Sequence, residues 1–242
     1  MRIKLLYSIG IIGLLCSCTL VNQHDPSGQN QTGTSVPSIN FAPNPQAAGS
    51  YVFQTNSSGD LNNDFICYDT KSAQTGDFDY AVTVTKSSGA DKGGFGIIFQ
   101  LTDAYNYWLL NIDLTGHYYL SKFMTGLVAG TTEENIVRDW TPFGGLPQNS
   151  GVPAKIEIIF TSSTSTYQIK FNDQAVTPTF TDNGDYGSAL TGGCLGLNAV
   201  VMPSENFPAI PVTISFAIVK PTSLNFASPT ASLSLRAVTG VH

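Results

Sequence analysis

The stretch from Gly93 to Phe123, GGFGIIFQLTDAYNYWLLNIDLTGHYYLSKF, contains three apolar runs separated by short polar turns. The runs cover residues 94–101, 107–113 and 117–123 and are rich in aromatic and β-branched residues. Runs of this length and composition, bounded by Asp, Asn and Gly, favour β-strands. The stretch therefore predicts three consecutive strands.

The same alternation of short apolar runs and turns continues on both sides of this stretch. No helical pattern of useful length competes with it, although GTTEENIVRDW at residues 130–140 allows a single helical turn. Eleven strands in about 175 residues are enough for one two-sheet sandwich, and we find no second domain and no internal repeat. The eight further strands are expected at residues 51–54, 65–70, 78–86, 154–162, 166–172, 174–181, 194–200 and 212–219.

Several of these segments, taken in order, resemble the concanavalin A-like jelly roll in its laminin-G-like branch. In that branch a Gly-led apolar strand precedes an aromatic strand, a Gly turn and a Tyr-x-Leu-x-Lys strand, as in residues 93–123. DWTPFGGL at 139–146, AKIEIIFTSSTSTYQIKFNDQAV at 154–176, GGCLGL at 192–197 and VTISFAIV at 212–219 follow in the family's order. Phe216 is followed by Ala217, where the family often has Asp. The resemblance implies an all-β, concanavalin A-like jelly-roll β-sandwich of two antiparallel sheets.

The amino-terminal residues MRIKLLYSIGIIGLLCSC read as an export signal. Two basic residues precede an apolar run at 5–15 that is too short to span a membrane. Ser17 stands directly before Cys18, which resembles the processing site of bacterial lipoproteins. We predict a lipoprotein signal peptide over residues 1–17 and acylation, including palmitate, at Cys18. An ordinary signal peptide is the alternative, and Cys16 fits less well because Leu15 would occupy the small-residue position.

The residue after the predicted lipid anchor is Thr19, where an Asp would favour retention in the inner membrane. By family analogy this implies a cell-envelope location, with the outer membrane favoured if the host has one. Residues 18–50 are polar and lack hydrophobic periodicity, which predicts a flexible tether. The jelly-roll domain is expected at 51–220, and a carboxyl-terminal extension at 221–242 contains SLSLRAV, which alternates well enough for one extra strand.

Charge excludes one class of function. The chain has 11 Lys and Arg and 17 Asp and Glu residues, and loss of the signal leaves a net charge of −8. A chain with few basic residues is a poor ligand for the phosphate backbone, so no nucleic-acid partner is expected. We expect a monomer that meets the membrane through its lipid anchor.

Strand parity divides the aromatic residues of the opening stretch between two faces. Trp108, Leu110, Ile112, Tyr118 and Leu120 share the face expected to point into the core. Sugars bind mixtures of rings and hydrogen-bonding groups, so the other face is a candidate ligand site, with an ordinary polar sheet face as the alternative. The candidate ligand-binding residues are Tyr107, Asn111, Asp113, His117 and Tyr119, with Trp140 expected on a rim loop.

Catalytic residues are not predicted. Retaining glycosidases need two carboxyl groups about 5 Å apart, and Glu157 in AKIEIIF has no acidic partner on its own strand. A polysaccharide lyase would need Tyr119, His117 and Lys122 to converge, but Lys122 has the parity of the core. The three His residues provide neither a Ser-His-Asp triad nor a zinc site. We therefore expect a protein that is not an enzyme.

Two further features concern metal and cysteine chemistry. GDLNNDF contains Asp60, Asn62 and Asp64, whose alternating oxygens fit a structural Ca²⁺, with a solvated turn as the alternative; no cofactor is required. Cys67 and Cys194 remain in the folded part, and an exported chain permits a disulfide between them, with two buried thiols as the alternative.

The function expected from the family resemblance is non-catalytic binding of a polysaccharide or glycoprotein. A cell-envelope adhesion or scaffold protein with a protein partner is the second hypothesis, and a glycan-active enzyme of the same fold is the third. Fold analogy alone carries the first of these.

Overall fold

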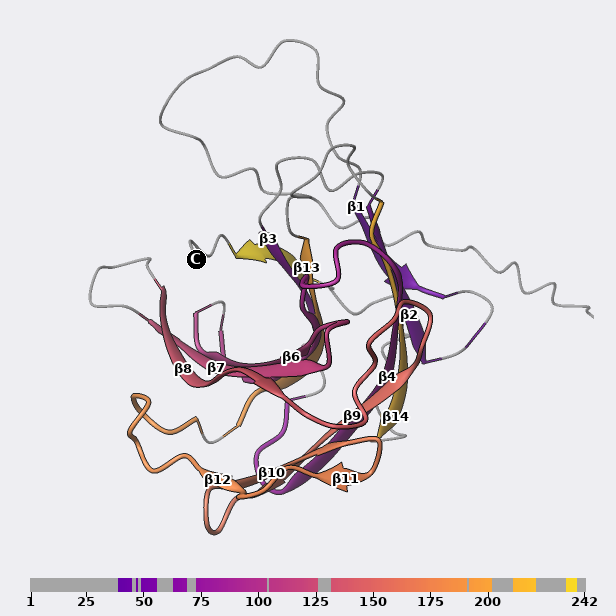
Figure 1. The fold of residues 1–242 in the computed structure, drawn as a ribbon. Coiled ribbons are helices and arrows are strands. Elements are labelled where there is room, and N and C mark those ends of the chain that lie inside the picture. Colours follow the sequence, from indigo (N-terminus) through magenta and orange to yellow (C-terminus); the bar gives the residue numbers. More distant parts are fainter. Residues whose placement is uncertain are drawn as a thin grey trace, which may run out of the picture.

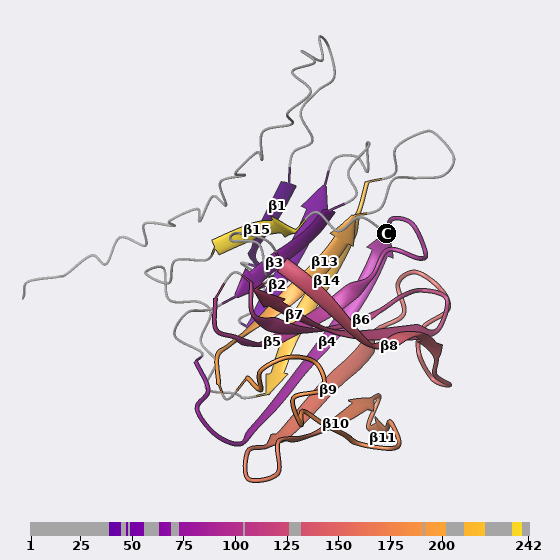
Figure 2. The same ribbon diagram turned by 90° about the vertical axis from the view of Figure 1, so that its left-hand side faces the viewer.

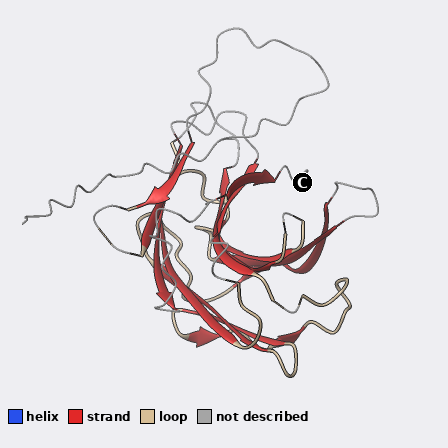
Figure 3. Ribbon diagram, turned by 180° about the vertical axis from the view of Figure 1, so that it is seen from behind, coloured by secondary structure: helices blue, strands red, loops and turns tan. Residues whose placement is uncertain are grey.

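The computed structural model describes residues 39–44, 47, 49–55, 63–68, 73–103, 105–125, 132–190, 192–201, 211–220 and 234–238. These residues form strands, turns and loops (Figure 3). No helix long and apolar enough to cross a membrane occurs among them.

Two antiparallel sheets make up the molecule. One contains, in spatial order, β1 (Ile39–Pro43), β2 (Ser50–Thr55), β14 (Thr213–Lys220), β4 (Phe78–Ser88), β9 (Ala154–Thr161), β10 (Thr166–Phe171) and β11 (Gln174–Ala175), with β12 (Phe180–Thr181) also paired to β10. The other contains β15 (Ser234–Val238), β3 (Asn63–Tyr68), β13 (Cys194–Val201), β5 (Phe95–Leu101), β6 (Tyr107–Ile112), β7 (His117–Thr125) and β8 (Thr132–Pro142). Strands from the two ends of the chain pair in both sheets, as in a jelly roll.

The seven-stranded sheet is bent into a trough, and its convex side faces the eight-stranded sheet (Figure 1). In the eight-stranded sheet, β1 and β11 are the two opposite edges, which lie at opposite ends of the molecule (Figure 2). The trough leaves the concave side of the seven-stranded sheet pointing away from the main core.

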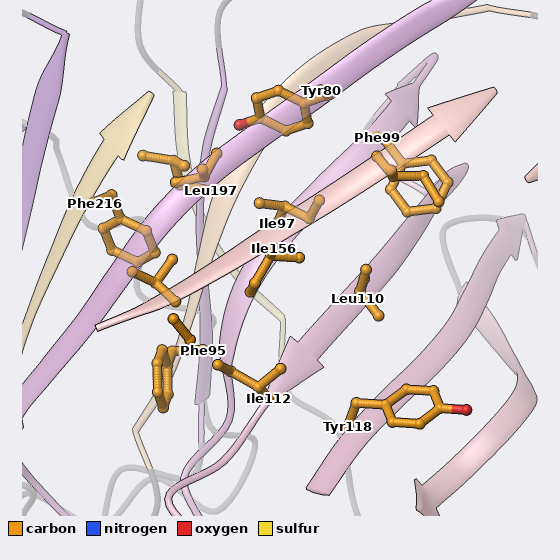
Figure 4. Close-up of a cluster of buried hydrophobic side chains, with 14 of the residues drawn as sticks. Tyr80, Phe95, Ile97, Phe99, Leu110, Ile112, Tyr118, Ile156, Leu197 and Phe216 are labelled. Carbon is orange, nitrogen blue, oxygen red and sulfur yellow. The ribbon is translucent and has the colours of Figure 1, made fainter. Parts of the chain in front are cut away.

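The main core fills the space between the two sheets. Its side chains come from alternate positions of the strands, including Phe95, Ile97 and Phe99 of β5 (Figure 4). Tyr80 of β4 crosses the core, and its hydroxyl donates to the carbonyl oxygen of Gly196 at 2.9 Å. Burial of so many large apolar side chains is the dominant favourable term in the stability of this fold. The face that parity assigned to the core is the face that packs here.

Outside the expected jelly-roll domain, one described segment was not predicted as a strand, and the extra strand expected in SLSLRAV is confirmed. Residues 39–43, expected in the tether, form β1 and pair with β2, so the tether expected at 18–50 is wrong for this part. A five-residue strand is too short for a periodic signal, and the free edge of β2 supplies its hydrogen bonds. Residues 234–238 form β15, which covers an edge of β3.

Two predictions inside the domain were also wrong. Residues 132–142 form the strand β8, so the helical turn suggested for 130–140 does not occur in the described part of that segment. Its charged residues suit an edge strand, where they oppose pairing with other chains. The single strand expected at 174–181 is divided into β11 and β12, with Pro178, which has no N–H to donate, between them.

Candidate functional site

A row of residues crosses the concave face of the seven-stranded sheet. Backbone pairing places Asn198 of β13, Gly96 of β5, Asn111 of β6 and Tyr119 of β7 side by side. The residues next to them in sequence, such as Leu110 and Leu120, point into the main core, so this row has the outward parity predicted for Asn111 and Tyr119. We call these four residues the concave row.

Glycine is required at the centre of the concave row. A Cβ on Gly96 would lie 2.1 Å from the carbonyl oxygen of Leu110, which is far inside van der Waals contact. The missing side chain leaves Asn198 and Asn111 adjacent across the glycine, and the Nδ2 of Asn198 donates to Oδ1 of Asn111 at 3.0 Å. Oδ1 of Asn198 is buried and has no hydrogen-bond partner among the described residues. The row therefore holds a buried acceptor that could still take a hydrogen bond.

Trp140 covers the end of this row. It lies on the edge strand β8, which corrects its expected place on a rim loop. Its ring packs against Tyr119 in a tilted arrangement, with centroids 5.3 Å apart and planes at 31°. The indole Cη2 lies 3.2 Å from the position that a Cβ on Gly94 would take, so the indole reaches from β8 toward the residue before β5. The side chain of Trp140 is 40% exposed, whereas Tyr119 beneath it is 6% exposed.

Tyr119 is held by a carboxylate on the same edge strand. Its hydroxyl donates to Oε1 of Glu134 at 2.7 Å. Burial raises the pKa of the Tyr119 phenol, and the hydrogen bond to Glu134 raises that pKa further, because both disfavour a phenolate. Tyr119 therefore stays a protonated donor and a rigid support for Trp140, and it is unsuited to act as a base.

Asp113 and His117 build the turn between β6 and β7. Oδ1 of Asp113 accepts the backbone N–H groups of Thr115 and His117, both at 2.9 Å. The hydroxyl of Thr115 contacts Nδ1 of His117 at 2.8 Å. Gly116 has a φ of 83° in the same turn, which favours glycine. The polar groups of Asp113 are thus occupied by the turn.

Tyr107 belongs to a second apolar cluster on the outward face. Its ring stacks on Phe123 with centroids 4.7 Å apart and planes at 13°, and it is 1% exposed. Buried Ile66, Ile98, Leu101 and Leu109 complete this cluster. The open ring-bearing face expected around Tyr107 is therefore closed at this residue, and the exposed aromatic surface of the face is concentrated at Trp140.

The residues considered for a polysaccharide lyase, Tyr119, His117 and Lys122, are separated by the fold. Lys122 points into the main core and pairs with Asp182 at 2.8 Å, both side chains being almost fully buried, so it lies on the opposite face from Tyr119. Tyr119, His117 and Lys122 do not converge.

Glu157 does have an acidic neighbour, which lies on another strand. Nζ of Lys220 donates to Oδ2 of Asp79 and to Oε1 of Glu157, both at 2.7 Å. Burial by itself would raise the pKa of Glu157, but the bond from Lys220 and the charges of Lys155 and Lys170 bring it below its ordinary value. This carboxyl is held ionised, which is unsuited to a proton donor. Only the register between β4, β9 and β14 could have revealed the cluster.

The remaining predicted residues are only partly described. Cys18, Asp60 and Asn62 lie outside the described residues, as do the side chains of Asp64 and Cys67. The backbone of Cys67 pairs with Leu197, three residues from Cys194, and the disulfide stays a prediction. Within the described part of the chain, no group of three or more His, Cys, Asp or Glu residues could hold a metal ion, and the calcium site likewise stays a prediction.

Fold and site together define a jelly-roll sandwich with an aromatic concave face. No family model matches the chain, and no curated protein matches it. Among solved structures, it is similar to the carbohydrate binding module CBM66 from Bacillus subtilis, with a TM-score of 0.44 and 16% identity over 73% of this chain and 91% of that chain.

Two other solved structures illustrate the range of similar sandwiches. The binding domain of botulinum neurotoxin DC in complex with SialylT has a TM-score of 0.43 and 11% identity, over 76% of this chain and 42% of that chain. The catalytic domain of an endo-1,3-beta-glucanase from Thermotoga petrophila has a TM-score of 0.36 and 8% identity, over 76% and 90%. Likenesses this weak do not identify a ligand, so the site is judged from its own residues.

Proposed function

We propose that this protein binds carbohydrate, without catalysis, through the concave face of its seven-stranded sheet, with Trp140 as the main contact. The observation that carries this proposal is the flat, partly exposed indole of Trp140, held in place by Tyr119 below it and by Gly94 at its tip. The C–H faces of a sugar ring stack on such a surface, while hydroxyl groups pair with nearby amides and carboxylates. The amides of the concave row and the carboxylate of Glu134 are the neighbouring polar groups.

Rigidity of the aromatic platform favours binding. Tyr119 is fixed at its hydroxyl by Glu134 and at its ring by Trp140, so little side-chain entropy remains to be lost when a ligand arrives. A buried, hydrogen-bonded Tyr beneath an exposed Trp favours recognition of a sugar ring. A protein-binding surface is expected to carry a broad apolar patch instead. The exposed apolar residue nearest to Trp140 in sequence, Ile136 on the same strand, is the feature that would favour a protein partner instead.

A glycan screen of the full chain tests this function. Trp140→Ala is expected to reduce binding of a captured glycan about tenfold, because the loss of a ring contact, about 0.5–1.5 kcal/mol, adds to the loss of the apolar area that the indole buries. Val152→Ala is the matched control, since Val152 is a similarly exposed apolar residue away from the concave row. Trp108 is buried and is the only other Trp, so ligand-induced changes in fluorescence report on Trp140. Glycan binding that persists in Trp140→Ala would show that the binding site does not lie on the concave face.

We propose further that the chain is a cell-envelope lipoprotein carrying its lipid at Cys18. The support is the signal-like residues 1–17 and the small residue before Cys18. Cys18→Ala should move the protein from the detergent phase to the aqueous phase and abolish incorporation of labelled palmitate. Cys16→Ala, two positions away, is the matched control and should leave both unchanged. Equal partitioning of the two variants would contradict the assignment.

A further inference from the structure

The side-chain amide of Asn111 lies next to the tip of the Trp140 indole. A Cβ on Gly94 would be 3.0 Å from Nδ2 of Asn111 and 3.2 Å from Cη2 of Trp140. The amide nitrogen and the indole carbon therefore border the same point of the concave face, where Gly94 has no side chain. A ligand that reaches the tip of the indole also comes close to this nitrogen.

Asn198 determines which end of the Asn111 amide faces Trp140. Nδ2 of Asn198 donates to Oδ1 of Asn111 at 3.0 Å. If the Asn111 amide turned by half a rotation, two N–H groups would face each other and this hydrogen bond would be lost. The oxygen of Asn111 is therefore held toward Asn198, and its nitrogen is held toward Gly94.

The nitrogen of Asn111 is a donor without a partner. Among the described residues, no group accepts a hydrogen bond from Nδ2 of Asn111. The amide pair is sealed from solvent at its other end, where Oδ1 of Asn198 is buried. Asn111 as a whole is 2% exposed, so its opening to the surface is small. A nearly buried donor that the protein leaves unsatisfied favours a ligand that brings an acceptor.

The indole narrows the kind of acceptor that fits. The part of Trp140 next to the donor is a ring carbon, so this point combines one N–H donor with apolar surface. A sugar hydroxyl supplies an acceptor but no apolar group. An acetamido group carries a carbonyl oxygen and a methyl group on the same carbon, so it matches both neighbours at once.

We infer that Asn111 determines the specificity of the Trp140 site and that this site takes sugars bearing an acetamido group. The inference rests on the proposed function, since it concerns the same site. The carbonyl oxygen of the acetamido group accepts from Nδ2 of Asn111, and its methyl group packs against Cη2 of Trp140. A sugar with a hydroxyl group at this position keeps the hydrogen bond and loses the methyl contact.

Oligosaccharides that share one backbone test the inference on the full chain. Chitin and cellulose oligomers of equal length differ only in an acetamido or a hydroxyl group at carbon 2 of each sugar. Glycosides of N-acetylgalactosamine and galactose repeat the comparison on a second ring. In at least one pair, calorimetric titration should show the acetamido member binding about fourfold more tightly, because it buries an additional methyl group. This preference is measured on the wild type, so it does not depend on the folding of a variant.

Asn111→Asp separates recognition from structure. The aspartate still accepts from Asn198, but it has no outward N–H. Affinity for the acetamido member should fall about tenfold, because its carbonyl oxygen then faces an acceptor. The hydroxyl member should stay within about threefold, because a hydroxyl group can donate to the new carboxylate. The preference is therefore expected to reverse, whereas a merely structural loss would weaken both members equally.

Two further variants complete the test. Asn198→Asp accepts from the Asn111 amide instead of donating to it, which turns the oxygen of Asn111 toward Trp140, so the preference should be lost although Asn111 is intact. Asn183→Asp is the matched control. Asn183 is exposed on the loop after β12, and its Oδ1 accepts the backbone N–H of Asp185 at 3.2 Å, which an aspartate preserves. This variant should keep the wild-type preference.

The contrary outcomes distinguish this inference from the proposed function. Binding that requires Trp140 but is equally strong for both members of each pair would overturn the acetamido preference and leave the binding site in place. An equal loss of both members in Asn111→Asp would show that Asn111 is structural. Absence of Trp140-dependent binding to any of these sugars would overturn the binding function itself.

Discussion

At the scale of single residues, Lys86 is unusual because it buries an ammonium group against two backbone carbonyl oxygens. Nζ donates to Ala90 and Gly93, both at 2.6 Å, and lies 5.5 Å from the ring centroid of Phe95. Burial lowers the pKa of Lys86 from 10.5 to about 8, although Asp91 and Asp113 act in the opposite direction. The ammonium occupies the kind of position that a bound cation takes among backbone carbonyls.

The depressed pKa of Lys86 predicts a rise in stability with pH. Between about 8 and 10.5 the unfolded chain holds this proton more tightly than the folded chain, so raising the pH favours folding. Between pH 7 and 9.5 the wild type should gain about 2 kcal/mol of unfolding free energy relative to Lys86→Met. Urea denaturation of both proteins across this range measures the difference, in which other titrating groups cancel. A flat difference would mean that Lys86 titrates normally.

The Lys122–Asp182 pair gives a second prediction at this scale. Both side chains are buried, Lys122 also donates to the carbonyl oxygen of Ser188 at 2.8 Å, and its Nζ lies 5.2 Å from the ring centroid of Trp108. Asp182→Asn should destabilise the protein by about 3 kcal/mol, because it leaves a buried charge uncompensated. Lys122→Met combined with Asp182→Leu should cost less than Asp182→Asn alone. Additive losses in the double variant, measured by urea denaturation, would argue against a coupled pair.

At the scale of elements, the contact between β8 and the loop before β5 determines where the indole of Trp140 lies. A Cβ on Gly94 would lie 3.0 Å from Nδ2 of Asn111 and 3.2 Å from Cη2 of Trp140. Both contacts are tighter than ordinary van der Waals contact, and the indole, which is partly exposed, is the group able to move. The glycine is thus a positioning residue for Trp140.

Gly94→Ala is therefore expected to displace the indole. Acrylamide quenching of Trp140 fluorescence should increase, and affinity for any Trp140-dependent glycan should fall about threefold to tenfold, which is about 1 kcal/mol. Gly144→Ala is the matched control, because a Cβ there meets nothing within 4 Å. Unchanged quenching in Gly94→Ala would show that the indole does not rest on this residue.

At the scale of the whole molecule, β15 protects the edge of the seven-stranded sheet. It pairs with β3 from Ser234 to Val238, although the two strands come from opposite ends of the chain. Without it, the N–H and C=O groups along one side of β3 would be available to other chains. We therefore expect the protein to remain monomeric only while β15 is paired with β3.

Removal of residues 221–242 should make the protein associate. Sedimentation velocity is expected to show dimers or larger species that increase with concentration, whereas removal of 239–242 alone leaves β15 intact and should preserve the behaviour of the full chain. A monomeric 221–242 deletion that retains its fold would show that the β3 edge is protected by other means.

Sequence periodicity predicted the faces of β6 and β7 because each of these strands is regular. Trp108 and Tyr118 point inward, and Asn111 and Tyr119 lie on the outward row, as alternation requires. The same rule fails at Gln100, whose φ of 50° marks an irregularity in β5. Beyond it, Leu101 joins Ile98 on the outward face, although the two differ by three positions. Alternation therefore predicts the face of a side chain only where the strand has no irregularity.

The sequence by itself determined the all-β class, the positions of most strands between residues 51 and 219 and the division of rings between the two faces of β6 and β7, because these depend on local composition and on a period of two. It missed β8 and the division between β11 and β12. Tertiary structure alone decided that Trp140 lies over Tyr119, that Asp79 meets Glu157 through Lys220, and that β1 and β15 cover sheet edges. These contacts join residues from different strands. They depend on register and on the curvature of the sheet, which arise from packing of the whole chain and leave no signal in any single segment.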